Sequence, residues 1–430
     1  MRKHITTFSA LLSIILMSLA TDAGAASRKV RAAGQEVKET ETATTVQEDP
    51  RVVYSKQDMQ KFPDPIKYGP WVHNVTEDGF NILWVTKEKT LSWVEVCEND
   101  GSNFYSCERP RYYRTVSGRR MAGTFHSVHI GGLKPGTSYM YKISGNIISN
   151  ETNPYRICYE GAYSAPAVYT VSTLDPTAGK CSFSMINDMH FDDAKYSSLI
   201  KGIKASDRDF LVLNGDIVSY AEKVDTMIKH SFEPIREISP YIPTVFARGN
   251  HEGRGPEWYL APEVFPTPTG EFYYSFRQGP VAFLVLDAGE DKPDNDVEYS
   301  GTADYDSYRA AELEWLKQTV SDPSFKDAPI KICLMHIPTL DRKDAWYSQK
   351  WICDNFIPVL NEAGLDLMLS GHHHKYIFSA KGDGRNNYPV IANSNDERLD
   401  VKAEVRDGKR SLVVSTVDVN GKVTRTLTIL

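Results

Sequence analysis

Five short motifs hold the side chains of this sequence that are best suited to chemistry, and each contains histidine, aspartate or asparagine. In chain order they are Asp188-Met189-His190, Gly215-Asp216, Gly249-Asn250-His251-Glu252, His336 and Gly371-His372-His373-His374. Each motif follows a run of apolar residues typical of a buried strand. Because sites in open α/β sheets form outside the carboxyl ends of the strands, we expect these side chains to form one site.

The side-chain types in these motifs favour divalent metal ions. Carboxylate, amide and imidazole groups together suit first-row divalent metals, in contrast to a soft thiolate metal or a calcium cage. Seven side chains can hold two ions if one carboxylate bridges them: Asp188, His190, Asp216, Asn250, His336, His372 and His374. Two ions about 4 Å apart polarise phosphoryl oxygens and lower the pKa of bound water to about 7. The set therefore predicts chemistry on phosphate esters.

Each motif also has a structural interpretation when it is taken alone. Asp-x-His and Gly-Asp are common in turns, and Asn250-His251 after Gly249 can serve the same purpose. His336 can be a buried histidine of the core, and three consecutive histidines can form a solvated tract. Their order, together with their placement after strand-like runs, favours a joint role.

The ordered set D-x-H, G-D, G-N-H-E, H and G-H-x-H closely resembles the calcineurin-like metallophosphoesterase superfamily, over about residues 182–391. This resemblance implies that Asp188, His190 and His374 bind one metal ion. It implies that Asn250, His336 and His372 bind the other, with Asp216 as the bridge. The expected cofactors are two divalent ions, which can be Mn, Zn or Fe.

The same resemblance implies roles on the substrate side of the metals. In that family the histidine of G-N-H stabilises the transition state or protonates the leaving oxygen, which assigns catalysis to His251. We expect Glu252 to orient His251, and Arg254 and His373 to bind substrate. Arg254 can alternatively be a surface residue, and His373 can point away from the metals. Asp287, after another strand-like run, is expected to have a structural role.

Two further segments, GPWVHNVTEDGFNILWVT and LKPGTSYMYKI, resemble the fibronectin type III-like domain that precedes the catalytic domain of purple acid phosphatases. The chain thus looks like a bacterial purple-acid-phosphatase-like protein. It departs from the G-D-x-x-Y pattern whose tyrosinate binds ferric iron, because Ser219 stands there and Tyr220 comes one residue later. His190 stands where those enzymes have glycine. A one-residue shift on an extended segment turns a side chain to the opposite face, so we expect Tyr220 to point away from the metals.

The elements around these motifs fall into two parts. Residues 63–174 contain short β-type runs, such as 80–86 and 93–97, and no helical periodicity, which predicts a small all-β sandwich. Residues 180–430 predict an α/β fold: a layered metallophosphoesterase domain of mixed β sheets flanked by helices. Its strand-like runs are 183–186, 210–213, 244–246, 281–286, 330–335 and 365–369, and its helix-like segments are 194–205, 222–238, 307–320 and 349–364.

The first 25 residues predict a secretory signal peptide: Arg2 and Lys3, an apolar run over 10–20 and a small-residue triplet over 23–25. A membrane anchor is the alternative, but the run is shorter than the ~20 residues of a spanning helix. Residues 26–62 are mostly polar and are expected to be a flexible leader. We therefore expect an exported protein, periplasmic or secreted, without a transmembrane segment in its mature form.

Composition agrees with a globular exported enzyme. The 430 residues favour two folded domains, and 41% hydrophobic with 24% charged residues is an ordinary balance. The net charge of -7 argues against stable nucleic-acid binding. The expected partner is a small phosphorylated substrate, as the metal-site motifs and the family resemblance imply. Among the six cysteines, Cys97 and Cys107 flank a turn that suits a bridged hairpin, although buried free thiols are equally compatible.

The resulting functional hypothesis is an exported phosphohydrolase that cleaves phosphate monoesters or diesters by attack of a hydroxide held on two metal ions. A nucleotidase or phosphodiesterase of the same mechanism is one alternative, with selectivity in loops such as 261–270 and 289–306. A catalytically inactive surface binding protein is another. The presence of all seven ligands and of His251 weighs against lost activity.

Overall fold

The N-terminal part of the described chain is built almost entirely of strands. The computed structural model describes residues 60–61, 63–153 and 155–430. The predicted signal peptide and the predicted leader, apart from residues 60 and 61, lie outside the described residues. Strands of this part are β1 (Gln60–Lys61), β2 (Ile66–His73), β3 (Gly79–Glu98), β4 (Arg111–Tyr112), β5 (Thr115–Val116), β6 (Arg119–Arg120), β7 (Gly123–Gly131), β8 (Ser138–Asn150), β9 (Cys158–Ser164) and β10 (Tyr169–Ser172).

Strand β3 organises this all-β part because it changes partners along its length. Residues 81–86 pair with β2 and residues 79–85 with β7, whereas residues 90–98 pair with β8. The runs 80–86 and 93–97, expected as separate strands, are therefore one strand. Strand partners bind the chain both before residue 87 and from residue 90 onward, and this keeps the polar segment between the two runs extended.

All six cysteines are free thiols in the structure, including Cys97 and Cys107.

The C-terminal part contributes to two mixed sheets, and the first continues through β2 into the strands of the all-β part. In the first, β11 (Lys180–Ile186), β12 (Phe210–Asn214) and β13 (Thr244–Ala247) are parallel, and β20 (Glu397–Arg406), β21 (Lys409–Asp418) and β22 (Val423–Thr428) follow antiparallel. The second has the order β14 (Tyr274–Gln278), β15 (Val281–Leu286), β16 (Ile330–Met335), β17 (Leu367–Ser370), β19 (Val390–Ala392) and β18 (Ile377–Ser379). Its strands β15, β16, β17 and β19 are parallel.

Aromatic side chains join the inner faces of the two sheets. The ring of Phe183 lies 5.1 Å from that of Phe210 in the first sheet and 5.5 Å from that of Phe283 in the second. These rings belong to one buried cluster that also contains Trp84 and Tyr141 of the all-β part. The hydrophobic core therefore continues from one part of the chain into the other.

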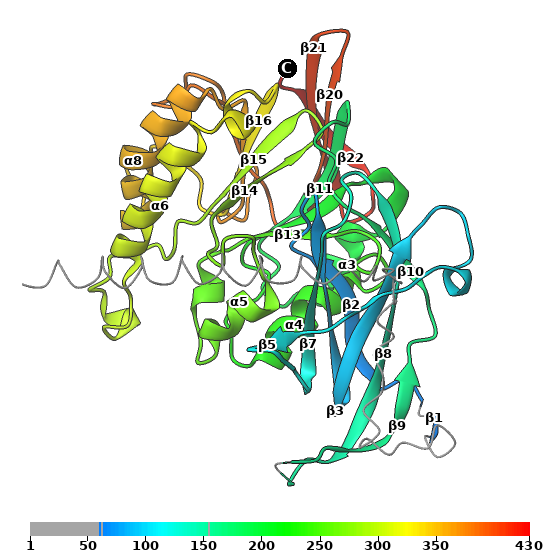
Figure 1. The fold of residues 1–430 in the computed structure, drawn as a ribbon. Coiled ribbons are helices and arrows are strands. Elements are labelled where there is room, and N and C mark those ends of the chain that lie inside the picture. The colour runs from blue at the N-terminus through cyan, green and yellow to red at the C-terminus, as the bar shows by residue number, and fades with distance from the viewer. Residues whose placement is uncertain (1–59, 62, 154) are drawn as a thin grey trace, which may run out of the picture. The chain divides into compact units, whose positions relative to one another are not determined.

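Helices cover the outer faces of the sheets, which gives the predicted layered α/β fold (Figure 1). The helices are α3 (Asp193–Ile200), α4 (Val224–Phe232), α5 (Ala261–Val264), α6 (Tyr305–Thr319), α7 (Pro323–Lys326) and α8 (Tyr347–Ala363). Short 3-10 turns are η1 (Phe104–Ser106), η2 (Ala205–Asp207), η3 (Glu233–Ile235), η4 (His251–Gly253), η5 (Trp258–Leu260) and η6 (Val297–Tyr299). Helices α3 and α4 pack on the first sheet, and α6 and α8 on the second.

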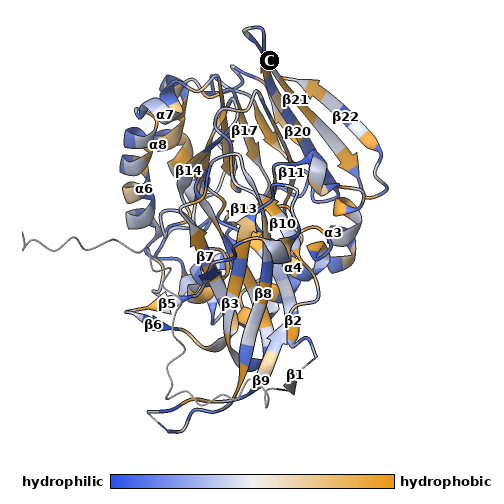
Figure 2. Ribbon diagram, turned by 45° about the vertical axis from the view of Figure 1, so that its right-hand side comes forward, coloured by the Kyte–Doolittle hydropathy of each residue, from blue (hydrophilic) through white to orange (hydrophobic). Residues whose placement is uncertain are grey.

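The hydropathy pattern follows this layering. Figure 2 shows hydrophobic residues along the central strands and hydrophilic residues on much of α6 and α8. Two helices are shorter than the sequence predicts: α3 ends at Ile200, shortly before Gly202, and α4 ends at Phe232, because Pro234 cannot continue the helical hydrogen bonding. Within the described residues, no helix combines the length and the apolar character needed to cross a membrane.

Candidate metal centre

The predicted ligands come from loops that directly follow parallel strands of both sheets. Asp188 follows β11, Asp216 follows β12, and Asn250 follows β13 in the first sheet. His336 follows β16 and His372 follows β17 in the second. Backbone hydrogen bonds hold these loops together: the His190 amide donates to the Asp216 carbonyl (3.0 Å), and the Gly371 amide donates to the His336 carbonyl (3.0 Å). Strand order thus collects residues that are almost 190 positions apart at the adjoining ends of the two sheets.

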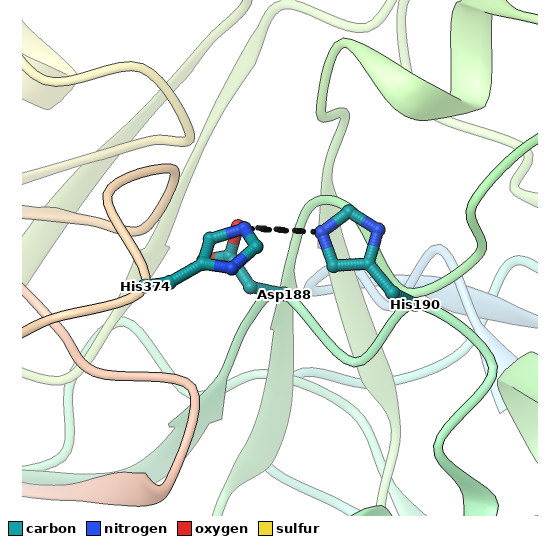
Figure 3. A group of neighbouring side chains, drawn as sticks. All are labelled: Asp188, His190 and His374. Atoms are coloured by element: carbon teal, nitrogen blue, oxygen red, sulfur yellow. Dashed lines mark hydrogen bonds and ion pairs between the residues drawn. The ribbon is translucent and has the colours of Figure 1, made fainter.

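Three groups of neighbouring side chains have atoms close enough to share a cation. They are Asp188 with His190 and His374, His190 with Asp216 and His251, and Asp216 with His336 and His372. In the first group, His374 Nε2 lies 3.3 Å from Asp188 Oδ1 and 3.2 Å from His190 Nε2 (Figure 3). In the third, His336 Nε2 lies 3.1 Å from Asp216 Oδ2. Asn250 Oδ1 lies 3.2 Å from His372 Nδ1.

Each carboxylate has one oxygen held by the protein and one directed at the histidines. Asp188 Oδ2 accepts hydrogen bonds from Asn187 Nδ2 (2.7 Å) and from the His372 amide (2.8 Å). Asp216 Oδ1 accepts one from the His251 amide (2.9 Å). Asp188 Oδ1 is buried and accepts no well-aligned hydrogen bond among the described residues, although His374 Nε2 lies 3.3 Å from it. Because an unpaired buried carboxylate oxygen is costly, this atom fits a cation ligand.

The orientation of His336 fits the same purpose. Its Nδ1 donates to the Asn214 carbonyl (2.7 Å), which leaves Nε2 facing the two carboxylates. Burial disfavours a charged ring, but the Asp216 and Asp188 carboxylates outweigh burial and raise the pKa of His336 to about 10. The two buried carboxylates therefore attract positive charge strongly. With imidazole nitrogens around them, they make a donor set suited to divalent metal ions.

Backbone strain is concentrated at these ligands. Five of them have φ in the left-handed region: Asp188 (56°), His190 (48°), Asp216 (53°), His372 (72°) and His374 (56°). Residues other than glycine rarely adopt such angles, and strain of this kind clusters at functional sites. The rest of the fold must hold these backbones in place, which is what directs their side chains at one another.

Close backbone approach explains two of the motif glycines. A Cβ on Gly249 would lie 2.2 Å from Asp216 Oδ1, and a Cβ on Gly371 would lie 2.6 Å from Asp188 Oδ2. Both distances are far below a normal contact. The glycines in G-N-H and G-H-x-H are therefore required by the carboxylates that they touch.

His251 stands at the edge of the ligand group, between Asp216 and Arg254. Its Nδ1 donates to the Ser219 carbonyl (2.7 Å), and its Nε2 accepts from Arg254 Nη1 (3.0 Å) and lies 3.9 Å from Asp216 Oδ2. Arg254 is held by Glu290 through two hydrogen bonds, Nε to Oε1 (2.6 Å) and Nη2 to Oε2 (2.8 Å). Sequence reasoning missed Glu290, because it lies in a loop without a motif.

Glu252 has a different position from the one expected. Its carboxylate accepts hydrogen bonds from the amides of Asp216 (3.0 Å), Ile217 (2.8 Å) and Gly249 (2.9 Å), and among the described residues it has none with the His251 side chain. The expectation that Glu252 orients the His251 ring is corrected accordingly. Glu252 fixes the backbone of the Gly215-Asp216 loop. Burial and the Asp216 charge raise the pKa of Glu252 to about 7.

Three other candidates lie outside the ligand groups. His373 is half-buried, and its Nε2 has no hydrogen-bond partner among the described residues. Asp287 accepts from the Tyr308 hydroxyl (3.1 Å) and pairs with Arg248 (Nη2 to Oδ2, 2.6 Å), as a structural carboxylate does. Tyr220 is 46% exposed and packs edge-to-face on Phe191, with ring centroids 5.5 Å apart.

A cavity of about 790 Å³ adjoins this site, and both Arg254 and Glu290 lie in its wall. Pro262 and Gly270 from the predicted selectivity loop 261–270 also line it. The predicted loop 289–306 supplies further wall residues, among them Tyr299 and Asp304. The two loops proposed from the sequence to hold selectivity thus meet at one cavity beside the metal ligands.

Comparisons with known proteins agree with this geometry. Residues 182–376 match the family model of calcineurin-like phosphoesterases. Human serine/threonine-protein phosphatase CPPED1 is 28% identical over 151 residues, 33% of this chain and 44% of the human protein. Purple acid phosphatase 22 of Arabidopsis thaliana is 22% identical over 319 residues, 70% of this chain and 64% of that protein. The matches therefore span less than two thirds of either relative.

Among solved structures, purple acid phosphatase PPD1 from yellow lupin (Lupinus luteus) seeds is similar in fold. It superposes with a TM-score of 0.60 over 84% of this chain and 73% of the lupin chain, at 15% identity. At that identity, the similarity establishes a shared fold.

Proposed function

We propose that this protein is a metal-dependent phosphoesterase that cleaves phosphate monoesters or diesters. The proposal starts from residues 182–376, which match the family model of calcineurin-like phosphoesterases. The observation that carries the proposal is the convergence of Asp188 Oδ1 and Asp216 Oδ2 with histidine nitrogens at the adjoining ends of the two sheets. The purple acid phosphatase and protein phosphatase names of the relatives support the same reaction class.

The proposed site holds two divalent ions. Asp188, His190 and His374 would bind one, Asn250, His336 and His372 the other, and Asp216 would lie between them. When bound, such ions polarise phosphoryl oxygens and activate water for attack on phosphorus. The identity of the ions, Mn, Zn or Fe, remains part of the proposal.

The chain's own groups act on the other side of the phosphate. His251 Nε2 lies 3.9 Å from Asp216 Oδ2 and accepts from Arg254. Once Arg254 turns to the phosphate and Nε2 takes up a proton, His251 would donate that proton to the leaving oxygen. Arg254 reaches the same nitrogen and brings positive charge to the position where negative charge develops in the transition state. Glu290 keeps Arg254 in that position through its two hydrogen bonds.

We also propose that the protein is exported, periplasmic or secreted. This rests on the basic start, apolar run and small-residue triplet within residues 1–25. A fibronectin type III-like character for residues 63–174 is proposed on the sequence resemblance, with support from the strands of that region.

A panel of phosphate monoesters and diesters, combined with metal analysis of the purified protein, tests the enzymatic proposal. We expect turnover of at least one ester class by protein that contains metal. A protein that is fully loaded with metal and turns over no phosphate ester would support the inactive binding protein instead.

A further inference from the structure

The cavity beside the metal ligands lies where the departing half of a substrate must go. In an in-line displacement, the leaving oxygen is opposite the attacking water and next to the group that protonates it. His251 is that group in the proposed function. Arg254, which donates to His251 Nε2 at 3.0 Å, is itself in the cavity wall. The cavity volume of about 790 Å³ is large enough for a leaving group of substantial size.

The charges around this cavity disfavour a second anionic group. Its cationic wall residues are Arg248, which pairs with Asp287 (2.6 Å), and Arg254, which pairs with Glu290 (2.6 Å) and acts on the reacting phosphate in the proposed function. Three further wall residues are exposed carboxylates: Glu298, which pairs with Lys292 (2.9 Å), and Glu271 and Asp304. An additional phosphate or carboxylate on the leaving group would therefore meet negative charge without a free cation to bind it.

Aromatic surface is available in the same cavity. Three aromatic wall residues, Phe272, Tyr305 and Tyr308, have their rings within 5.0–5.6 Å of the Arg248 guanidinium. Trp258, also in the wall, is 45% exposed. An exposed tryptophan in a cavity wall offers a large flat face, on which a ring can stack at little conformational cost.

We infer that this enzyme prefers phosphate esters whose leaving group is ring-bearing and carries no negative charge, and that Trp258 contacts that ring. The inference rests on the proposed function and adds the substrate class. It assigns specificity to Trp258 together with the carboxylates of the cavity wall. Nucleoside polyphosphates, whose leaving groups are anionic, are disfavoured by the same surface.

Matched alkyl esters test the ring preference without changing leaving-group chemistry much. Benzyl phosphate and propyl phosphate both release a primary alcohol, so their intrinsic reactivities are similar. We expect the metal-loaded wild type to show a kcat/KM about tenfold higher for benzyl phosphate, corresponding to about 1.4 kcal/mol of ring contact. Trp258→Ala should remove most of this preference by raising KM for benzyl phosphate far more than KM for propyl phosphate.

Tyr259→Ala is the matched control, since Tyr259 is 59% exposed, neighbours Trp258 in η5 and does not line the cavity. It should keep the preference. Equal kcat/KM values for the two esters in the wild type would overturn the inference while leaving the proposed function intact. An equal loss of kcat/KM on both esters in Trp258→Ala would do the same.

A charged leaving group tests the role of the wall carboxylates. We expect kcat/KM for 4-carboxybenzyl phosphate to be about tenfold lower than for benzyl phosphate. The double variant Glu271→Gln, Asp304→Asn should reduce this ratio. The same ratio in the wild type and the double variant would contradict the role of the wall carboxylates.

Binding of benzylphosphonate, which cannot be hydrolysed, separates the inference from turnover. Calorimetry should show tighter binding of this compound than of propylphosphonate by wild type, and no such difference in Trp258→Ala. If the protein turned over no ester but kept this binding difference, the proposed function would fail and the cavity assignment would stand. Equal binding of the two phosphonates would refute the cavity assignment.

Discussion

At the residue scale, His251 and His372 each lie in a group with Asp216 but have different surroundings. His372 lies beside Asn250 Oδ1 and in the group with Asp216 and His336. His251 is tied through Nδ1 to a backbone carbonyl and through Nε2 to Arg254. On these contacts we propose metal binding for His372 and proton transfer for His251.

Alanine substitutions of the two histidines should therefore impair activity for different reasons. His251→Ala should keep its metal but lose about 100- to 10,000-fold in kcat, the usual cost of removing a general acid. His372→Ala should instead lower the metal content. Metal analysis alongside steady-state kinetics distinguishes the two results, and equal metal loss in both variants would show that the roles are misassigned.

Tyr220 leads to a spectroscopic prediction. Because it packs on Phe191 and is 46% exposed, while His190 lies with Asp188 and His374, no phenolate is expected on a metal. The iron-loaded, oxidised protein should lack the intense visible band of a tyrosinate bound to ferric iron, and Tyr220→Phe should leave its spectrum unchanged. A purple band that disappears in that variant would prove Tyr220 a ligand.

The sequence predicted the ligand candidates because each follows an apolar strand-like run. It did not predict what Glu252 does, since its partners are backbone amides of a loop about 35 residues earlier, which only the fold brings close. Glu290 and Asn187 were missed for a similar reason. Their function comes from the side chains they hold, Arg254 and Asp188, and no local pattern marks them.

At the element scale, the loop after β13 is tightly packed against the loop after β12. Gly249→Ala would place a methyl carbon 2.2 Å from Asp216 Oδ1, so we expect reduced metal content and at least tenfold lower activity. Gly179→Ala is the control, because its added Cβ would meet no atom closer than 3.8 Å. Full metal content and activity in Gly249→Ala would contradict the described packing of the site.

Strand β7 contains a buried histidine that should make stability depend on pH. Burial, and then the Arg114 charge, lowers the pKa of His126 to about 3, so its neutral form is favoured in the fold. Its stabilising effect is complete above the ordinary value near 6.5 and is lost as pH falls from there towards 3. This residue should add about 1.4 kcal/mol per pH unit to the slope of unfolding free energy.

Urea denaturation between pH 4.5 and 6.5 measures that slope. His126→Gln should reduce it by about 1.4 kcal/mol per pH unit, whatever its effect on absolute stability. His129→Gln, on the exposed face of the same strand, should leave the slope unchanged. The same slope in wild type and His126→Gln would show that His126 is protonated without cost to the fold.

Element boundaries were harder to predict than element types. The strand-like runs at 281–286 and 330–335 correspond to β15 and β16 as predicted, since both are continuous apolar runs. The continuity of β3 depends on its change of partner near residue 90, which is a tertiary effect. Likewise, α4 gives way to η3 at Glu233, where Pro234 interrupts the helical pattern.

At the scale of the whole molecule, one buried cluster extends from Trp84 in the all-β part to Leu334 in the second sheet. The proposed metal ligands lie at the ends of strands from both sheets, so the packing of these sheets determines the distances within the site. The sequence indicated the layered fold and the ligand set, because strand-like runs and motifs alternate. It could not show which loops meet at the cavity, since 261–270 and 289–306 have no regular pattern.

Metal removal and stepwise restoration test the central claim, a phosphoesterase that depends on two ions, most directly. After verified removal of metal, hydrolysis of an aryl phosphate should be abolished, because activation of water depends on the ions. Addition of Mn or Zn should restore it, with activity rising until about two ions are bound per chain, as the proposed two-metal site requires. Activity that survives complete removal of metal would contradict the account.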